Sequence, residues 1–85
     1  MICTVGILQD KNCRIGTPCF IRDRVAYYFN CGTGMIVARA NFIVNFKSTF
    51  RFMDENDALK WFNKNVIIAE KSRIGEQKEF FNYIL

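Results

Sequence analysis

Apolar and polar residues alternate between Ile36 and Phe52, and this alternation is the strongest structural signal in the chain. The even positions are apolar at all but one place, whereas the odd positions include Arg, Asn, Lys and Thr. A period of two residues is typical of a strand with one buried and one solvated face. A strand usually has about five or six residues, so either one strand bends through this segment or two strands are joined. The parity does not switch, which favours a bent, barrel-like strand or an odd-numbered loop and predicts that the even positions face the core.

Three further strands are predicted before this segment, and each ends at a polar or glycine-containing turn. The strands cover residues 2–8, 14–21 and 25–29, and the clearest turns lie at 9–12 and 30–34. Pro18 has no N–H to donate to a neighbouring strand, so the second strand is predicted to be an edge strand or to be bulged. Gly32 and Gly34 reach positive φ at little cost, which favours a hairpin turn here over a phosphate-binding loop.

A helix is predicted at about residues 54–63. Asp54 is a good N-cap, and the acidic residues that follow it suit the positive end of the helix dipole. Ala58, Leu59 and Phe62 form one apolar face of this helix. We expect that face to dock on the even positions of the alternating segment.

The end of the helix is less sharply defined than its start. The Asn-Lys-Asn segment at residues 63–65 supplies a stop signal, because asparagine tolerates the left-handed conformation that caps many helices. Residues 66–70 then suit a short strand, although their apolar positions also align with the helix face if the helix continues. After Gly75 the apolar residues fit a short C-terminal helix, with a strand as the alternative.

Length and composition agree with one small α+β domain spanning residues 1–85. The 85 residues leave no room for a second core, and a hydrophobic content of 51% argues against a disordered chain. The predicted fold is a curved, mostly antiparallel sheet of four to six strands, barrel-like in one interpretation, packed on the helix at about 54–63.

Four cysteines, at positions 3, 13, 19 and 31, raise the question of a metal site or of disulfides. Their spacing lacks the paired knuckles of a structural zinc site, and the chain has no histidine. The N-terminal residues lack the basic and apolar regions of a secretory signal, and no apolar run is long enough to span a membrane. We therefore expect a cytoplasmic protein whose cysteines are reduced and structural, with no metal, no cofactor and no membrane association.

Catalytic chemistry is poorly supported by the side chains of this chain. Without histidine there is no Ser-His or Cys-His pair, and no cysteine has the C-x₅-R spacing of a phosphatase loop. Helix capping explains the acidic cluster Asp54, Glu55 and Asp57 better than acid–base chemistry or calcium binding does. We therefore predict that the protein is not an enzyme.

A basic stretch supports one class of binding function. Arg39, Lys47 and Arg51 occupy odd positions of the alternating segment, with Asn41 and Asn45 between them. Residues two apart on a strand lie about 6.5–7 Å from one another, close to the phosphate spacing of a nucleic-acid strand. A nucleic-acid-binding face is therefore the alternative function, although the net charge of +4 is small and polar residues cover any half-buried strand.

The aromatic content of 15% supports the function that we place first, which is binding to another protein. A domain of this size has little interior volume for so many rings, so some are expected on the surface, where they often anchor interfaces. Tyr28 and Tyr83 are the candidate anchors. The predicted protein is thus a small interaction module, an accessory or inhibitor protein that binds a larger partner, with a homodimer as an alternative. The frequent Phe, Ile, Asn and Lys have A+T-rich codons, which suggests a phage or plasmid gene.

Overall fold

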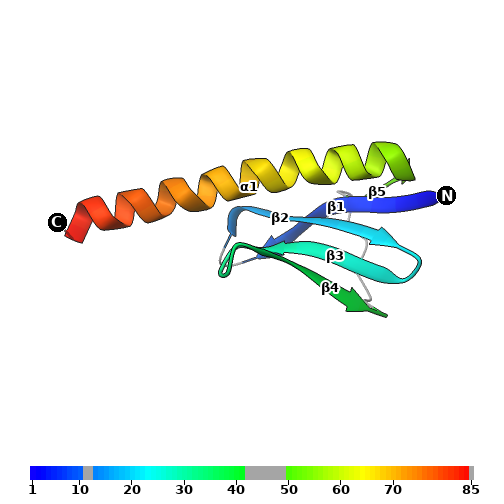
Figure 1. Ribbon diagram of the computed structural model, residues 1–85, viewed down its shortest axis with the longest axis horizontal. Coiled ribbons are helices and arrows are strands. Elements are labelled where there is room, and N and C mark those ends of the chain that lie inside the picture. Colours follow the sequence, from blue (N-terminus) through cyan, green and yellow to red (C-terminus); the bar gives the residue numbers. More distant parts are fainter. Residues whose placement is uncertain (11–12, 42–49, 85) are drawn as a thin grey trace.

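The computed structural model describes the backbone of residues 1–10, 13–41 and 50–84 and the side chains of residues 1–9, 16–41 and 50–73. Within these ranges the chain forms five strands and one helix. In chain order they are β1 (Ile2–Asp10), β2 (Cys13–Arg22), β3 (Val25–Asn30), β4 (Met35–Ala40), β5 (Arg51–Asp54) and α1 (Glu55–Ile84). Figure 1 shows the strands as one layer with α1 lying across it. The predicted α+β fold, an antiparallel sheet packed on a helix, is confirmed.

The sheet is open, with strand order β4-β3-β2-β1-β5 and antiparallel pairing throughout. The first four strands follow one another as neighbours, and β5 pairs with β1. β4 and β5 therefore lie at opposite edges, although they are consecutive strands of the described chain (Figure 1). The barrel-like interpretation is wrong, because a barrel requires its two outer strands to pair with each other.

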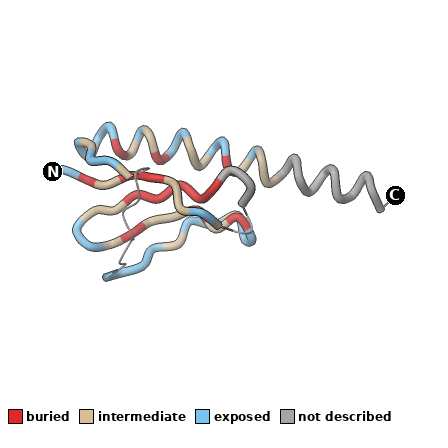
Figure 2. The backbone as a smooth tube through the Cα atoms, turned by 180° about the vertical axis from the view of Figure 1, so that it is seen from behind, coloured by how far each residue is buried: buried red, intermediate tan, exposed pale blue. Residues whose placement is uncertain are grey.

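The main core lies between α1 and one face of the sheet, which we call the helix side. It consists of buried apolar side chains from both layers: Cys3, Val5, Phe20, Ala58 and Phe62. The ring centroids of Phe20 and Phe62 lie 6.0 Å apart, with the rings tilted by 36°, within the range of favourable aromatic pairs. Figure 2 shows buried residues along the central strands and on the helix where it faces them. The helix docks through Phe62, as predicted, but the prediction that it docks on the even positions of the alternating segment is wrong, because its partners lie on β1 and β2.

The alternating segment does not form one strand with an inward face. Cross-strand partners share a face, and Ile36 pairs with Phe29 on the helix side. Phe52 instead pairs with Thr4 on the opposite face, the reverse side, where its side chain is 76% exposed. Ile36 itself is 52% exposed, so the prediction that the even positions face the core is wrong for β4 and β5. The remaining residues of the segment, 42–49, lie outside the described residues.

A smaller apolar layer covers the reverse side of the sheet. Cys19 and Ala26 are fully buried there. The ring of Phe50 lies directly over Gly6, so closely that a side chain at this position would overlap the ring. Glycine at position 6 therefore permits the close approach of Phe50 to the sheet.

Pro18 lies in β2, which is an interior strand of the sheet. At Pro18, however, β2 is hydrogen-bonded to only one of its two neighbouring strands. β2 pairs with β1 opposite Pro18, whereas its pairing with β3 is confined to Cys19–Arg22. The ladder with β3 thus stops before a residue that cannot donate a hydrogen bond. Gly16 has a positive φ of 86°, and the register of β1 shifts between Leu8 and Asp10, so the predicted irregularity is present.

α1 begins where the sequence predicts it. Asp54 is the N-cap, because its Oδ2 accepts a hydrogen bond from the Asn56 N–H at 3.3 Å. The Glu55 N–H donates to the Met1 carbonyl at 3.0 Å. This bond ties the first turn of the helix to the start of the chain.

The helix does not stop at its Asn-Lys-Asn segment but continues as one element of 30 residues. Asn65 does not cap it, since its side-chain Nδ2 donates to the Trp61 carbonyl one turn earlier, at 2.7 Å. Val66 and Ala69 continue the buried side of the helix, and this packing outweighs the local preference of the segment for a strand. The predicted helix end and the short strand after it are therefore wrong. The residues after Gly75 are helical, as predicted, but they are the end of α1 and not a separate helix.

Cys31 is disulfide-bonded, whereas Cys3 and Cys19 carry free thiols. The expectation that all four cysteines are reduced is therefore wrong. A disulfide depends on the distance between two cysteines in the folded chain, which their spacing in the sequence does not show. Burial raises the pKa of the Cys19 thiol to about 11, and burial also raises the pKa of Cys3. Both free thiols are thus held in the neutral form near pH 7.

Replacing Phe62 by Ala should lower the free energy of unfolding by about 3–5 kcal/mol, because the ring is buried against Phe20. Phe52→Ala is the matched control, since that ring is exposed, and it should change the free energy by less than about 0.5 kcal/mol. Urea denaturation followed by circular dichroism measures both values. Equal losses from the two variants would contradict the placement of α1 on the sheet.

Thiol titration should separate the cysteines into two classes. A disulfide consumes two of the four thiols, so denaturation without reductant should leave Cys3 and Cys19 reactive, and all four should react after reduction. In the native protein Cys19 should be alkylated slowly near pH 8, since a pKa of about 11 leaves little thiolate. Mass spectrometry of the alkylated peptides measures both. Four reactive thiols before reduction would show that the disulfide is absent.

Candidate functional site

One helix cannot cover a five-stranded sheet. Five strands spaced about 4.8 Å apart are about 19 Å wide, whereas a helix with its side chains is about 10 Å across. α1 packs mainly on β2, with further contacts to β1 and β5. In Figure 1, β3 and β4 lie farther from the helix, with β4 the most distant. The helix side of these two strands is therefore only partly covered.

A groove lies between α1 and the helix side of β3 and β4, and it consists of two adjoining hollows. The first has a volume of about 230 Å³ and is lined by Phe20, Arg22, Tyr27, Ile36, Leu59, Phe62 and Asn63. The second has a volume of about 460 Å³ and is lined by Phe29, Gly34, Ile36, Val66, Ile67, Glu70 and Lys71. Because both hollows share Ile36, we treat them as one feature and call it the α1–β4 groove.

Most of the lining of the α1–β4 groove is apolar, and part of it is open to water. Ile36 on β4 and Ile67 on α1 are 52% and 56% exposed. Several large apolar side chains at one concave place are unusual on a small soluble protein, and such a place is typical of a binding surface.

An ion pair closes the first hollow on one side. The Arg22 NH1 atom lies 2.6 Å from the Glu55 Oε1 atom, and the guanidinium carbon lies 5.9 Å from the centroid of the Phe20 ring. The hydrogen bond to Glu55 is the largest cause that raises the pKa of Arg22. Arg22 is therefore held in place by the first turn of α1, and its charge is balanced there.

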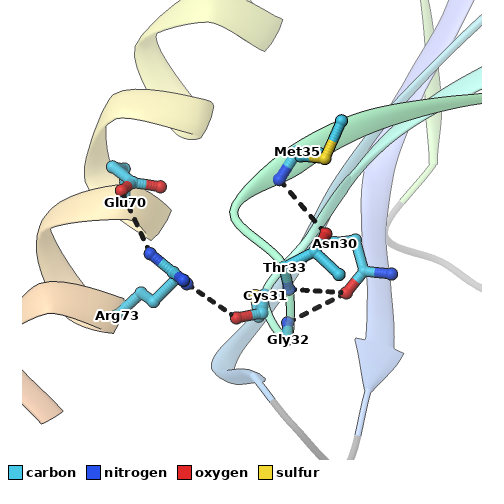
Figure 3. Close-up of polar contacts among 7 residues, drawn as sticks. All are labelled: Asn30, Cys31, Gly32, Thr33, Met35, Glu70 and Arg73. Carbon is cyan, nitrogen blue, oxygen red and sulfur yellow. Dashed lines mark hydrogen bonds and ion pairs between the residues drawn. The ribbon is translucent and has the colours of Figure 1, made fainter. Parts of the chain in front are cut away.

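A second polar contact attaches α1 to the turn between β3 and β4, beside the second hollow. Arg73 on α1 donates from Nε to the Cys31 carbonyl at 3.0 Å, and its NH1 atom lies 3.4 Å from Glu70 Oε1 (Figure 3). A side chain at Gly34, whose φ is 74°, would meet the Arg73 guanidinium at about 3.0 Å. Since Cys31 is also disulfide-bonded, this turn is fixed from two directions.

The turn itself is organised by one asparagine. Asn30 Oδ1 accepts hydrogen bonds from the Gly32 N–H at 2.9 Å and the Thr33 N–H at 3.3 Å (Figure 3). The Asn30 carbonyl accepts a further bond from the Gly34 N–H at 2.7 Å. Asparagine side chains commonly stabilise turns in this way. The sheet wall of the groove is thus preformed rather than dependent on a ligand.

The charged groups around the α1–β4 groove leave it with an excess of positive charge. Glu55 and Glu70 are each paired with an arginine of this chain. Lys60, Lys64 and Lys71 are exposed on α1, with Lys71 at the edge of the second hollow, and the ion pairs between described side chains do not include them. Among the described side chains of α1, these three lysines outnumber the exposed carboxylate near them, which is Asp57. An acidic ligand would therefore meet lysines along one margin of the groove.

The structure does not bring the predicted site residues together. Arg39 pairs with Ala26 on the reverse side of β4, whereas Arg51 pairs with Val5 on the helix side of β5. The two arginines thus lie on opposite faces and at opposite edges of the sheet, so they cannot form one continuous basic strip. Lys47 and Asn45 lie outside the described residues.

The other predicted site residues lie away from the groove or outside the described side chains. Tyr28 is half-buried on the reverse side, where it pairs with Val37. Asn41 follows β4 with a positive φ of 54°, and its N–H donates to the Arg24 carbonyl at 2.9 Å, so it has a role in the backbone turn. Tyr83 belongs to α1, but its side chain is not among those described.

The groove-lining residues were missed because the sequence offers no single motif for them. The available signal was the apolar run at Val66 and Ile67, whose positions align with Leu59 and Phe62 on one continuous helix. Because this run was predicted to be a strand, it was not recognised as a continuation of the helix face. The position of Ile36 in the groove could not be predicted for a different reason. Alternation shows which residues share a face of a strand, but it does not show whether a helix covers that face.

The described part of the chain offers little for other kinds of site. No three Cys, Asp or Glu side chains gather there as metal ligands would. Its helix has no segment long and apolar enough to cross a membrane. The chemistry that the groove itself can supply is burial of apolar side chains, with charged groups at the margin.

Comparison with known proteins found no match to the chain among family models, curated proteins or solved structures. The geometry of the groove is therefore the feature of this chain that points to a function.

Arg73→Ala should loosen the turn between β3 and β4, because the Cys31 carbonyl loses its side-chain donor. We expect the free energy of unfolding to fall by about 1–2 kcal/mol, and hydrogen exchange of the Gly34 and Met35 amides to become faster. Arg51→Ala is the control, since Arg51 is exposed on the distant strand β5. Mass spectrometry of the peptides that contain the turn measures the exchange rates. Unchanged exchange in the Arg73 variant would show that the disulfide holds the turn alone.

Proposed function

We propose that this protein is a small, non-enzymatic interaction module that binds another protein in the α1–β4 groove. The observation that carries the proposal is the groove itself, which joins two apolar hollows and leaves Ile36 and Ile67 more than half exposed. An enclosed cavity would suit a small molecule. This groove is open and lies beside an edge strand, which suits a segment of a larger molecule.

Burial of apolar side chains in the groove would contribute to the free energy of binding. Full burial of an aliphatic side chain contributes about 1.5–3 kcal/mol, and a partner that fills the groove would bury Ile36 and Ile67 together with its own anchors. A few such central residues supply most of the binding free energy in many interfaces. The two fixed walls add to this, because a preformed site loses little conformational entropy on binding.

Protein binding is the class of function that the sequence also predicts. The proposed binding surface is a different one, the α1–β4 groove. An aromatic and a basic residue do take part, since Tyr27 and Arg22 line the first hollow, whereas Tyr28 lies on the other face. An accessory or inhibitor role, and a phage or plasmid origin, stay predictions. A cytoplasmic location also stays a prediction, and the disulfide at Cys31 speaks against it, because disulfides are rare in reducing compartments.

Two neighbouring isoleucines allow a matched test of this proposal. Protein fragments selected from a display library against the wild-type chain should bind Ile67→Glu at least about tenfold more weakly, because a carboxylate in the apolar groove opposes burial. Ile68→Glu should bind them as the wild type does, since Ile68 is exposed but does not line the groove. Biolayer interferometry measures the affinities, and thermal melts verify that both variants fold.

Two outcomes would contradict the proposal. Fragments that bind the wild type and both variants equally would place the interface elsewhere. Tight, salt-sensitive oligonucleotide binding, unaffected by Ile67→Glu but lost on removal of surface lysines and arginines, would favour the nucleic-acid alternative.

A further inference from the structure

We infer that the occupant of the α1–β4 groove is an amphipathic helix of a partner protein that lies along α1 and carries acidic residues on the flank facing its lysines. This inference rests on the proposed function and specifies the partner. It follows from three observations, which are the spacing of the two hollows, the small side chains on β4 and the unbalanced lysines of α1.

The spacing of the hollows matches a helix. On α1, Leu59 and Asn63 line the first hollow, and Val66 and Glu70, each seven residues later, line the second. Seven residues of helix rise about 10.5 Å. A partner helix aligned with α1 would place its residues i and i+7 at the same interval and on nearly the same side.

An extended strand matches the interval along α1 less well, although on the sheet wall the hollows are lined by Tyr27 and Phe29, two residues apart on β3. At about 3.4 Å per residue, about 10 Å corresponds to three residues, and residues three apart on a strand point to opposite faces. Residues two or four apart point to the same face but are about 7 or 14 Å apart. A strand added to the edge of β4 would lie in the plane of the sheet, one strand spacing farther from α1 than β4 is, and so would not enter the groove.

The floor beside the groove leaves room for a second helix. Ala38 and Ala40 continue the helix side of β4 beyond Ile36, opposite Tyr27 and Val25 of β3. Both alanines are exposed and carry only a methyl group. Packed helices lie about 8–10 Å apart, so a helix beside α1 would rest on β3 and β4, where the sheet is uncovered.

The charges around the groove specify the polar side of the partner. Glu55 and Glu70 are already paired with Arg22 and Arg73, respectively, so they do not offset the lysines of α1. A helix beside α1 would bring one flank close to Lys60, Lys64 and Lys71. Asp or Glu on that flank would complement these lysines, and such marginal charges mainly affect the association rate and the choice of partner.

The same lysines argue against a second copy of this chain as the occupant. If α1 of another copy lay in the groove, it would bring Lys60, Lys64 and Lys71 toward the same three residues. Like charges placed together oppose association.

Three display libraries of peptides about 18 residues long test the inference. The first has a helical Ala-rich background with variable residues at i, i+3, i+4 and i+7 and Glu at the outer positions. The second differs only in carrying Lys at the outer positions. The third alternates variable and polar residues, as a strand would. Only the first should yield binders whose affinity for Ile67→Glu falls about tenfold or more while that for Ile68→Glu does not change.

Charge variants test the role of the lysines. With the tightest peptide of the first library, the triple variant Lys60→Glu, Lys64→Glu, Lys71→Glu should bind about tenfold more weakly, chiefly through slower association. The control reverses three exposed arginines away from the groove, Arg24→Glu, Arg39→Glu and Arg51→Glu, and so has the same net charge. It should bind within about twofold of the wild type.

Each contrary outcome identifies what has failed. Suppose that only the strand library or only the Lys library yields binders that Ile67→Glu weakens. This result would overturn the inference and leave the proposed function intact. The same holds if protein fragments bind the groove but no helical peptide does. Self-association of the chain that Ile67→Glu abolishes would make the occupant a second copy. If neither the peptides nor the protein fragments bind Ile67→Glu more weakly than the wild type, the proposed function is overturned as well.

Discussion

The packing of Phe62 on Phe20 determines where α1 lies on the sheet. Phe20 is central on β2, and its ring contacts Tyr27 of β3 on one side and Phe62 of α1 above it. Because the largest buried side chain of the helix meets the sheet here, α1 runs over β2 and its neighbour β1. The helix is too narrow to reach the far edge from this position. The uncovered helix side of β4 is a direct consequence.

The groove keeps its shape because α1 is attached at two separate places. Near its start, Glu55 pairs with Arg22 of β2. Further along, Arg73 donates to Cys31 in the turn after β3, and the disulfide at Cys31 holds the same turn. Between these attachments one side of α1 packs on the sheet through Phe62 and Ala69, and the neighbouring side, with Leu59 and Val66, lines the groove. A small domain has little stability to spare, so these attachments also contribute to holding the fold together.

The reverse side of the sheet shows how differently the two faces are used. Cys19 and Ala26 are buried there, and the ring of Phe50 covers Gly6. The two faces of β4 differ in charge, since Arg39 lies on the reverse side and the helix side has only apolar side chains. Charges that point inward from an edge strand protect it against association. The helix side of β4 lacks this protection, which agrees with a surface that has a partner.

The sequence by itself determined the types of the elements and several of their boundaries. The strands at the front of the chain and the cap at Asp54 were predictable, because they depend on residues that are neighbours in the sequence. Of the predicted site residues whose side chains the structure describes, Tyr28, Arg39, Asn41 and Arg51, none lines the groove. A groove is the space that packed elements leave between them, which local sequence does not show. Only the tertiary structure decided that α1 continues through Val66, because burial outweighs a local preference for strand. It also decided that Ile36 and Phe52 face opposite sides of the sheet, although they share one parity, because β4 and β5 pair with different neighbours at opposite edges.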